Sequence, residues 1–312
     1  MLANIGMTTD AGVMQVLYNA GIRTELFPLL IFVGVGAMID FSPLLAMPKM
    51  ALLGAAGQFG IFGTLILATL LGFPLNEAAS IGVIGAIDGP TAIFVTTKLA
   101  VAAYSYMSLV PIIQPPIMRA MTTRAERRIK MEYAPRPVSK RALIIFPILV
   151  TLVVGLIAPD AAPLIAMLML GNLLRVSGVV ERLNKSAQNE IVNVATLFLG
   201  VIIGATMTAE SFLKLNTLYI LLLGLLAFVL DTVAGLFFGK LMSLASGGKI
   251  NPLIGACGIS AFPMAGRLAA QVAQEEDFEN FILMHAMGAN TAGQLGSVVA
   301  GGVLLALTTA LL

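Results

Sequence analysis

Long apolar runs, separated by short polar stretches, make up most of the chain. A membrane-spanning helix needs about 20 apolar residues. Three runs are clean candidates for such helices: residues 51–74, 142–158 and 217–239. Further apolar stretches are irregular: residues 26–39, 79–97, 101–118, 161–174, 191–208, 251–273 and 281–312. The pattern predicts an all-α polytopic membrane protein with roughly nine to eleven membrane segments, several of them discontinuous.

Several of these segments contain helix-breaking residues. Asp88-Gly89-Pro90 interrupts the stretch 79–97, three prolines lie within 101–118, and the polar sequence GANTAGQLG predicts that 281–312 forms two helical pieces. Inside a bilayer, backbone groups freed by a break need partners in the protein or in a watery cavity. The broken segments are therefore the first places to look for a binding site.

The chain also contains an internal repeat. LIFVGVGAM, which begins at Leu30, resembles LFLGVIIGATM, which begins at Leu197, and VIGAIDGPTAIF resembles LIGACGISAFPM farther along. Phe32 precedes Gly85 by 53 residues, and Phe198 precedes Gly255 by 57 residues. Breaks at corresponding places in two repeats indicate a substrate or ion site near the midplane. The sequence alone does not determine whether the second repeat is inverted.

Charge is scarce and unevenly distributed. The 312 residues are 58% hydrophobic and 11% charged, far below the share of about 25% in soluble domains. The net charge of +2 gives no argument for nucleic acid or acidic substrates. Eight of the 18 Lys and Arg residues fall in one window, which the positive-inside rule places in the cytoplasm: Arg119, Arg124, Arg127, Arg128, Lys130, Arg136, Lys140 and Arg141. This window is either a solvated charge run or a binding patch.

The repeat and the charged window together divide the chain. We expect a first membrane repeat over 1–118, a basic cytoplasmic loop over 119–141, connecting membrane segments over 142–190 and a second membrane repeat over 191–312. The one cysteine, Cys257, excludes an internal disulfide framework, and no Cys/His spacing predicts a zinc site.

Asp88 is the leading candidate for chemistry. An acid within a membrane segment is costly and marks a functional site by default. Pro90 lacks an amide hydrogen, and the break leaves upstream carbonyl oxygens without helical partners. A carboxylate, these carbonyls and the hydroxyl of Thr91 would form an oxygen-only site, which suits hard cations. Asp88 can also cap the second half-helix, and the two roles are compatible.

The second broken segment offers Asn251, Ser260 and Arg267. On a continuous helix, Asn251 and Ser260 would lie about 13–14 Å apart, so they share an ion only if the helix is interrupted. The guanidinium of Arg267 suits a carboxylate, although it could equally extend to the membrane interface. Taken together, the residues indicate a cation-coupled membrane transporter.

Four polar groups remain open to two interpretations. Asn290, Thr291, Gln294 and Ser297 provide further neutral oxygens, or serve only helix packing. Tyr104 and Tyr106 could relay a proton. Asp231 is either part of a site or a helix-packing hydrogen bond, and the lone His285 favours a structural role.

Several long motifs resemble one known family. GAIDGPTAIF, AAYSYM, PIIQPPIMRAMT, INPLIGACGISAFPMAGR and NFILMHAMGANTAG closely resemble the β subunits of the sodium-pumping, biotin-dependent decarboxylases, across the whole chain. The resemblance implies two inverted repeats with broken helices, similar to elevator-type transporters, assembled as a trimer. Family members are longer before residue 1 and after Ala100, so we expect further spans in the intact protein.

The family's functional residues fall on matching positions of this sequence. The resemblance implies catalytic roles for Asp88, Tyr106 and Arg267. It implies a Na+ site at Asp88, Asn251, Ser260 and Asn290, and carboxybiotin binding at Arg267 and Gly255.

The family resemblance also implies an activity and partners. The subunit would decarboxylate carboxybiotin on a carrier, consume a proton and export Na+ across the bacterial inner membrane. The expected partners are a carboxyltransferase α subunit, a biotin carrier domain and a small single-span γ or δ subunit. The competing hypothesis is a stand-alone Na+-coupled secondary transporter, either an anion symporter or a Na+/H+ antiporter. A passive membrane anchor does not explain Asp88.

Overall fold

The computed structural model describes residues 12–85, 88–95, 100–132, 137–206 and 215–311, which form helices and connecting loops without a β-strand. In the first half of the chain the elements are α1 (Val13–Leu17), the π-helical turn η2 (Tyr18–Ile22), α2 (Leu26–Met38), α3 (Ser42–Ala46), α4 (Met50–Ala56), α5 (Phe59–Leu70), α6 (Leu75–Ile84), α7 (Gly89–Val95), α8 (Ala100–Met121) and α9 (Arg124–Arg127).

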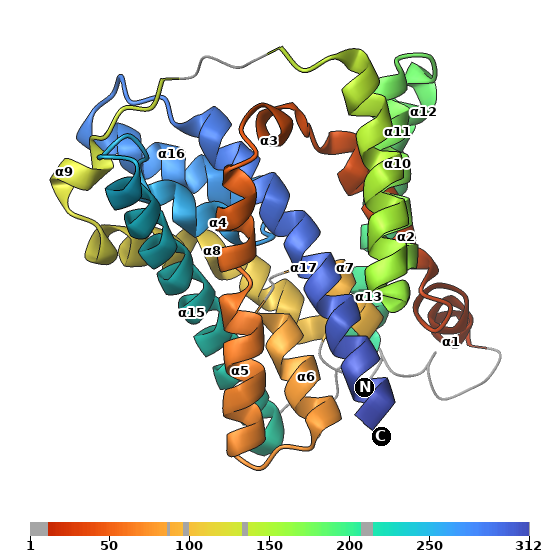
Figure 1. The fold of residues 1–312 in the computed structure, drawn as a ribbon. Coiled ribbons are helices and arrows are strands. Elements are labelled where there is room, and N and C mark those ends of the chain that lie inside the picture. Colours follow the sequence, from red (N-terminus) through yellow and green to blue (C-terminus); the bar gives the residue numbers. More distant parts are fainter. Residues whose placement is uncertain (1–11, 86–87, 96–99, 133–136, 207–214, 312) are drawn as a thin grey trace.

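The second half begins with a connecting helix pair (Figure 1). Its elements are α10 (Lys140–Ile157), the 3-10 turn η4 (Pro159–Ala161), α11 (Ala162–Ser177), α12 (Glu181–Ser186), the π-helical turn η5 (Ala187–Ile191), α13 (Val192–Thr206), α15 (Leu215–Ala245), the 3-10 segment η6 (Pro252–Gly258), α16 (Met264–Glu276) and α17 (Leu283–Leu311).

Within the described residues, six helical stretches are long and apolar enough to cross a membrane: Met50–Leu70, Lys140–Ile157, Pro159–Ser177, Glu181–Ala205, Thr217–Ala245 and Leu283–Leu307. The pair Val13–Ile22 and Leu26–Met38, bent by 57°, would make a seventh span. The expected count was higher because it included 79–97, 101–118 and 251–273, which are broken or rich in proline. The prediction of a polytopic all-α membrane protein is confirmed.

The prediction for the last segment is wrong. Residues 281–312 do not form two pieces: α17 is one helix over Leu283–Leu311, despite its polar residues and glycines. Conversely, the clean run 51–74 contains an unpredicted interruption at Gly57 and Gln58, between α4 and α5. Both differences place polar groups of distant segments against one another, as described below.

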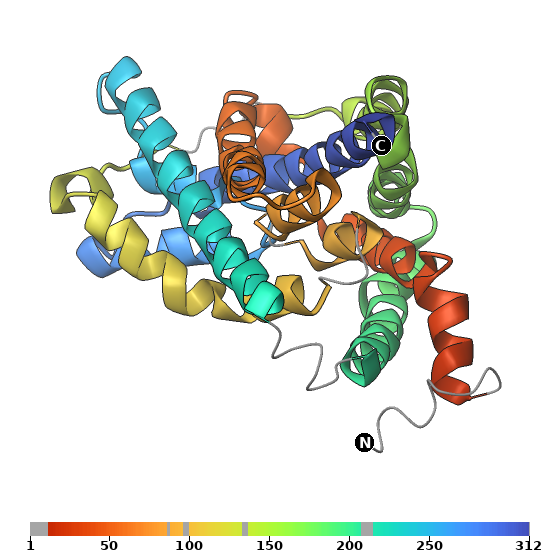
Figure 2. The ribbon, with the colours of Figure 1, turned by 90° about the horizontal axis from the view of Figure 1, so that it is seen from below.

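The two stretches that the sequence predicts to be repeats contain elements in the same order. Each has an apolar helix, a long spanning stretch, a broken segment and another long helix: α2, α4–α5, α6–α7 and α8 in the first, and α13, α15, η6–α16 and α17 in the second. Helix α17 packs against α4, η6, α16 and α3, and seen from below it crosses the middle of the molecule (Figure 2). The second break and α17 thus lie in the interior of the molecule.

The segment η6 occupies the centre of the fold, and all seven of its residues are buried. It packs against α15, α17, α16 and α4. Glycines allow this proximity: a Cβ on Gly255 would lie 1.9 Å from the carbonyl oxygen of Gly235, and one on Gly258 would lie 2.1 Å from that of Leu53. The backbone of η6 is therefore held between neighbouring backbones with little room to move.

Helices α2 and α11 also meet backbone to backbone. A Cβ on Gly36 would lie 1.8 Å from the carbonyl oxygen of Leu168, and one on Gly171 would lie 2.0 Å from that of Val33. Beside this contact, Asn172 Nδ2 donates to the carbonyl of Ile39 at 2.9 Å. Small residues at such a crossing are typical of helix packing in membranes.

Candidate functional site

Asp88 lies at the first break, directly before α7, and is 4% exposed. Its carboxylate Oδ1 accepts from the backbone N–H of Thr91 at 3.4 Å, and Oδ2 accepts from the Thr91 hydroxyl at 2.8 Å. The Asp88 side chain therefore caps the second half-helix, as one of the two compatible interpretations predicts.

Helix α17 supplies two more donors to the same carboxylate. Gln294 Nε2 donates to Asp88 Oδ2 at 2.7 Å, and Ser297 Oγ donates to Oδ2 at 3.2 Å. All the described partners of Asp88 are neutral, and none is a Lys or Arg side chain. An ionised carboxylate buried among neutral groups is costly unless a cation joins it.

Gln294 and Ser297 were not predicted to contact Asp88. Their spacing of three residues places both on one helix face, which is the signal the sequence contained. The same spacing also suits simple helix packing, so the sequence could not identify the carboxylate that they contact.

Three side-chain amides, each from a different element, hold the backbone of the second break. Gln114 Nε2 of α8 donates to the carbonyl of Ala256 at 2.7 Å, Gln58 Nε2 donates to that of Gly258 at 2.9 Å, and Asn290 Nδ2 donates to that of Ile259 at 2.7 Å. Gln58 also donates to the carbonyl of Gly293 on α17 at 3.2 Å. The interruption between α4 and α5 therefore places Gln58 between the second break and α17.

Helix α17 connects the two breaks. Its Asn290 contacts the second break, and its Gln294, one turn later, contacts Asp88 at the first. One turn of α-helix advances about 5.4 Å along the axis. The two breaks thus meet on adjacent turns of α17.

Several buried oxygens near the second break have no hydrogen-bond partner among the described residues. They are Gln58 Oε1, Gln114 Oε1, Asn290 Oδ1 and Thr291 Oγ1. A buried acceptor without a partner costs about 1–3 kcal/mol, and a hard cation is a ligand that neutral amide and hydroxyl oxygens can bind. No cluster of His, Cys, Asp or Glu suited to a transition metal occurs in the described part of the chain.

The remaining predicted site residues lie in different places. Ser260, 3% exposed, follows η6 within the second break. Gly255 packs against Gly235 of α15. Arg267 is exposed on α16, and among the described residues it forms no ion pair. The side chain of Tyr106, on α8, lies outside the described residues.

Asn251 is not among the described hydrogen-bond partners of Asp88. It lies at the start of η6, 0% exposed, where its Nδ2 donates to the carbonyls of Arg127 and Ile129. Asp231 is also 0% exposed, and its Oδ1 accepts from the N–H of Gly60 at the start of α5. Of the two interpretations of Asp231, this contact is the helix-packing hydrogen bond.

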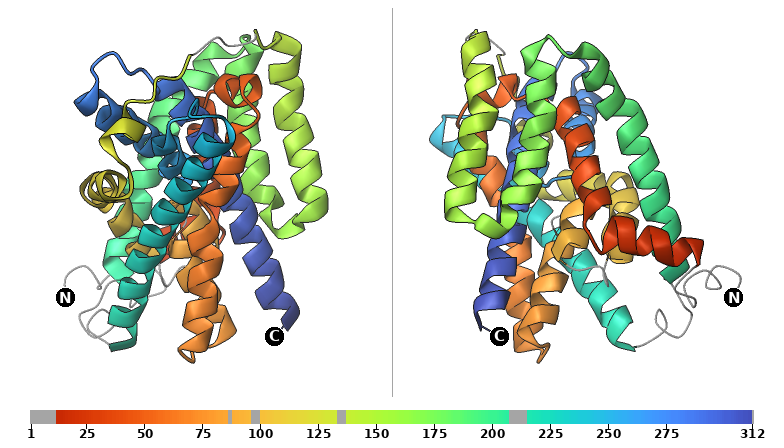
Figure 3. Two further views of the ribbon diagram at one scale, coloured as in Figure 1. Left: turned by 60° about the vertical axis from the view of Figure 1, so that its left-hand side comes forward. Right: turned by 90° about the vertical axis from the view of Figure 1, so that its right-hand side faces the viewer.

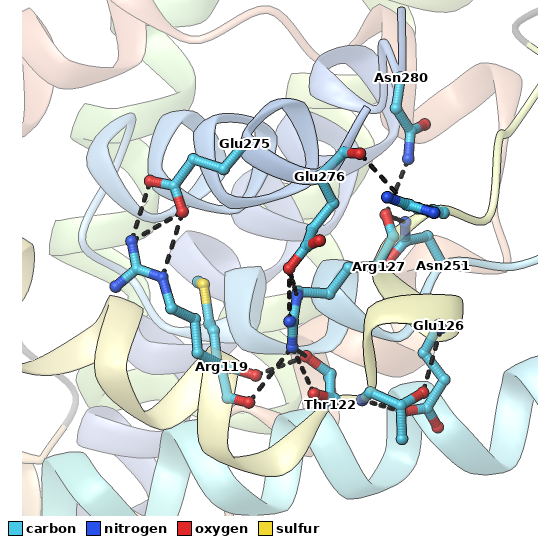
Figure 4. A network of polar contacts seen from close by, with 11 residues as sticks. Arg119, Thr122, Glu126, Arg127, Asn251, Glu275, Glu276 and Asn280 are labelled. Atoms are coloured by element: carbon cyan, nitrogen blue, oxygen red, sulfur yellow. Dashed lines mark hydrogen bonds and ion pairs between the residues drawn. The ribbon is translucent and has the colours of Figure 1, made fainter. Parts of the chain in front are cut away.

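Three side chains of the basic window are paired with acids of the second half of the chain. Arg119 forms an ion pair with Glu275, Arg127 with Glu276, and Lys130 with Asp277 and Glu279. Figure 4 shows the pairs of Arg119 and Arg127, which join the end of α8 and α9 to the end of α16. The segment from Arg119 to Lys130 is therefore attached to the end of α16 and the residues that follow it.

Acid should weaken this attachment. The hydrogen bond from Arg127 holds the pKa of Glu276 below its ordinary value of 4.5, and that from Lys130 holds the pKa of Asp277 below 3.8. A carboxylate with a lowered folded-state pKa stabilises the fold above its unfolded-state pKa, and this contribution is lost as pH falls through the folded-state value. We expect the thermal unfolding temperature, followed by circular dichroism, to decrease below about pH 4.5.

A double variant, Glu276→Gln with Asp277→Asn, isolates this effect. It should unfold at a lower temperature than the unmodified protein at neutral pH, and the difference should shrink toward acid pH. A difference that stays constant across the whole pH range would contradict the role of these ion pairs.

The chain was compared with known proteins. The family of Na+-transporting oxaloacetate decarboxylase beta subunits matches residues 1–308. The chain belongs to this family. The resemblance noted from the motifs is thereby confirmed, and the protein is a multi-pass membrane subunit of a sodium-translocating decarboxylase.

Relatives with three different names are about equally similar. The probable oxaloacetate decarboxylase beta chain of Pasteurella multocida is 54% identical, covering 98% of this chain and 74% of the relative. The methylmalonyl-CoA decarboxylase subunit beta of Propionigenium modestum is 56% identical, covering 96% and 78%. The glutaconyl-CoA decarboxylase subunit beta of Acidaminococcus fermentans is 52% identical, covering 98% and 84%. Overall identity therefore does not separate the named substrates of this family.

Proposed function

We propose that this beta subunit decarboxylates carboxybiotin presented by a partner subunit and couples the reaction to Na+ export. The observation that carries the proposal is the buried Asp88 carboxylate, which receives only neutral donors where the two breaks meet on α17. Na+ is the cargo, and Asp88, Ser260 and Asn290 are its proposed ligands. The unpartnered oxygens of Gln58 and Thr291 support a cation in the same region.

The reaction needs one proton for each carboxyl group lost. The bond between the ureido nitrogen and the carboxyl carbon breaks, CO2 leaves, and the electron pair remains on the nitrogen, which takes up a proton. We propose that the carboxylate of carboxybiotin binds Arg267, because a guanidinium matches the geometry of a carboxylate. Gly255 is a second proposed contact of carboxybiotin. Asp88 or Tyr106 supplies the proton. A proton on Asp88 after Na+ has left prevents the ion from returning.

The directions of the helices support an inverted repeat. In Figure 1, α4–α5 run downward while their counterpart α15 runs upward. In the right-hand view of Figure 3, α2 runs upward and α13 runs downward. Equivalent elements with opposite directions are the mark of inverted-repeat transporters, in which one bundle moves against another around a midplane site. We propose an elevator-like movement on this basis.

The proposed assembly contains a carboxyltransferase α subunit, a biotin carrier and a small γ or δ subunit, around a trimer of this chain in a bacterial inner membrane. The relatives' names differ in acyl substrate at similar identity. This agrees with an acyl substrate that is selected by the carboxyltransferase and not by the beta subunit.

Affinity purification and transport assays test the proposal. The native complex should bind avidin through a biotinylated partner, and inverted vesicles should accumulate Na+ only when the acyl substrate is added. Vesicles that contain this chain alone should not exchange Na+ for protons. Such exchange, or an avidin fraction without this chain, would support the stand-alone transporter instead.

Substitution of Gln294 provides a further prediction. The Gln294 amide stabilises the charged form of Asp88, which is the form that binds a cation, and a hydrogen bond to a charged group is worth about 1.5–3 kcal/mol. We expect Gln294→Ala to raise the Na+ concentration for half-maximal decarboxylation by roughly 10-fold or more. Gln271→Ala, on the exposed face of α16, is the control. Equal Na+ dependence of the two variants would remove Gln294 from the site.

A further inference from the structure

Two asparagines hold one short backbone segment between them. Asn251 Nδ2 donates to the carbonyls of Arg127 and Ile129 at 3.0 and 2.9 Å. Asn280 Nδ2 donates to the same two carbonyls at 2.8 and 3.2 Å. Figure 4 shows both amides directed at the chain that follows α9. The two side chains approach it from opposite ends of the η6–α16 segment, one before η6 and one after α16.

The amide hydrogens of the two asparagines match the two carbonyls. Each amide group has two hydrogens and each carbonyl oxygen has two lone pairs, so the four hydrogen bonds use all the amide hydrogens and all the carbonyl lone pairs. Both asparagines are 0% exposed. Because water does not reach them, the loss of either side chain leaves Arg127 and Ile129 each one donor short.

The same segment has additional contacts with the second repeat. The backbone N–H of Asn251 points to the sulfur of Met131 at 3.3 Å, and Arg128 Nε donates to the carbonyl of Glu276 at 3.2 Å. The Arg127 guanidinium, 9% exposed, is paired with Glu276. Residues 127–131 are therefore bound to the start of η6 and the end of α16, although in the sequence they follow α8 and α9.

The cluster fixes one end of η6, and the proposed ion site lies at the other end. Asn251 Oδ1 accepts from the N–H of Leu253 at 3.0 Å and caps η6. Seven residues of 3-10 helix extend about 14 Å, which brings the chain to Gly258 and to the carbonyls held by Gln58 and Asn290. Since close glycine contacts confine η6 along its length, a shift at Asn251 must be transmitted to the break.

We propose that Asn251 and Asn280 are paired positioning residues, which lock segment 127–131 to η6 and thereby set the carbonyls of the second break, and that Asn251 does not bind Na+. The side-chain amides of Asn290, beside the second break, and of Asn251, at the start of η6, differ in one respect. Asn290 has an unpartnered Oδ1 beside the break, whereas both hydrogens and the oxygen of Asn251 are already engaged. Asn280 Oδ1 has no described partner, so only its two donated hydrogens enter the argument.

The experiment compares Asn251→Ala, Asn280→Ala and the double variant in the assembled complex. The control is Asn189→Ala, because Asn189 also donates to a backbone carbonyl, that of Lys185, but on an exposed surface. The rate of trypsin cleavage after Arg127, Arg128 and Lys130 measures how firmly the two asparagines hold segment 127–131, which we call the clamp. This measurement does not depend on activity. Each single variant should be cleaved about 10-fold faster, and the double variant faster still, because each of the two carbonyls then loses both of its donors.

Kinetics then separate positioning from ion binding, a step that rests on the proposed function. In both single variants kcat should fall while the half-saturating Na+ concentration stays within about twofold of the parent. If Asn251→Ala raises that concentration by 10-fold or more and leaves cleavage unchanged, Asn251 is an ion ligand and the proposal is overturned. Unchanged cleavage in Asn280→Ala also overturns it.

Two further outcomes are distinguishable. If the unmodified complex shows no Na+-dependent decarboxylation, the proposed function fails, whereas the cleavage comparison still decides whether the clamp exists. If the alanine variants do not assemble, Asn280→Asp replaces them, since it keeps the shape of the side chain and lacks both donated hydrogens. Slow cleavage of Asn280→Asp, equal to the parent, would overturn the clamp.

Discussion

Asn in place of Asp88 should reduce Na+-dependent decarboxylation by at least about 100-fold, the lower range for loss of a proton-transferring group. Asparagine has the same shape and can still accept from the N–H of Thr91, so α7 keeps its cap. It can neither neutralise a cation nor exchange that cation for a proton. Two rates should be measured at several Na+ concentrations: the rate of decarboxylation by the purified complex and the rate of Na+ uptake into inverted vesicles.

Asp160→Asn is the matched control for Asp88→Asn. Asp160 lies in η4 on the exposed surface, away from either break, so its loss should leave both activities unchanged. Decarboxylation that remains Na+-dependent in Asp88→Asn would show that this carboxylate is not the coupling site. A loss of activity equal in both variants would instead indicate a general effect of removing charge.

Alanine at Gly36 or Gly171 should destabilise the fold by about 3 kcal/mol or more, the upper end for overpacking. The added Cβ would lie 1.8 Å or 2.0 Å from a carbonyl oxygen of the facing helix. A backbone atom cannot rotate away as a flexible side chain does, so α2 and α11 must separate along their contact. The expected result is a large decrease in unfolding temperature in detergent, with little folded protein recovered.

The control for these glycines lies on α13. A Cβ on Gly200 or Gly204 would meet nothing within 4 Å, so alanine there should be neutral or stabilising by up to about 1 kcal/mol through helix propensity. If Gly36→Ala unfolded at the same temperature as Gly200→Ala, the close approach of α2 and α11 would be contradicted.

The sequence predicted the features that depend on local composition. The apolar runs predicted membrane helices, and Asp88-Gly89-Pro90 predicted a break with a buried acid. The internal match between residues 83–94 and 253–264 placed the second break. These predictions succeeded because a charge, a proline or an apolar stretch has nearly the same cost wherever it occurs in a bilayer.

The partners of these features could not be predicted in the same way. Gln58 contacts Gly258, 200 residues away, and Asn251 contacts the carbonyls of Arg127 and Ile129. A backbone carbonyl is present at every residue, so no side-chain pattern in the sequence marks the one that will accept a hydrogen bond. The sodium-ligand role of Asn251 stays a prediction from the family, and its observed contacts favour a different role.

Helix α17 shows why a polar stretch need not break a helix. Asn290, Gln294 and Ser297 lie on one face, and each finds a partner at one of the two breaks. A polar side chain within an apolar helix is unfavourable only while it lacks a partner. The prediction of two pieces rested on the polar sequence GANTAGQLG alone, and the partners that these side chains find at the two breaks could not be read from it.

The continuity of α17 has a consequence for which ions the pump can use. The spacing of Asn290 from Gln294 is set by the helical rise of about 1.5 Å per residue, and hydrogen-bonded backbone resists compression. In the proposed site, the Asn290 oxygen and the Gln294 amide that holds Asp88 are fixed to this helix, so the two proposed ligands cannot move together around a smaller ion. Discrimination between Li+ and Na+ would then depend on helix geometry, and a residue inserted between Asn290 and Gln294 would turn Gln294 about 100° away from Asp88 and abolish Na+ dependence.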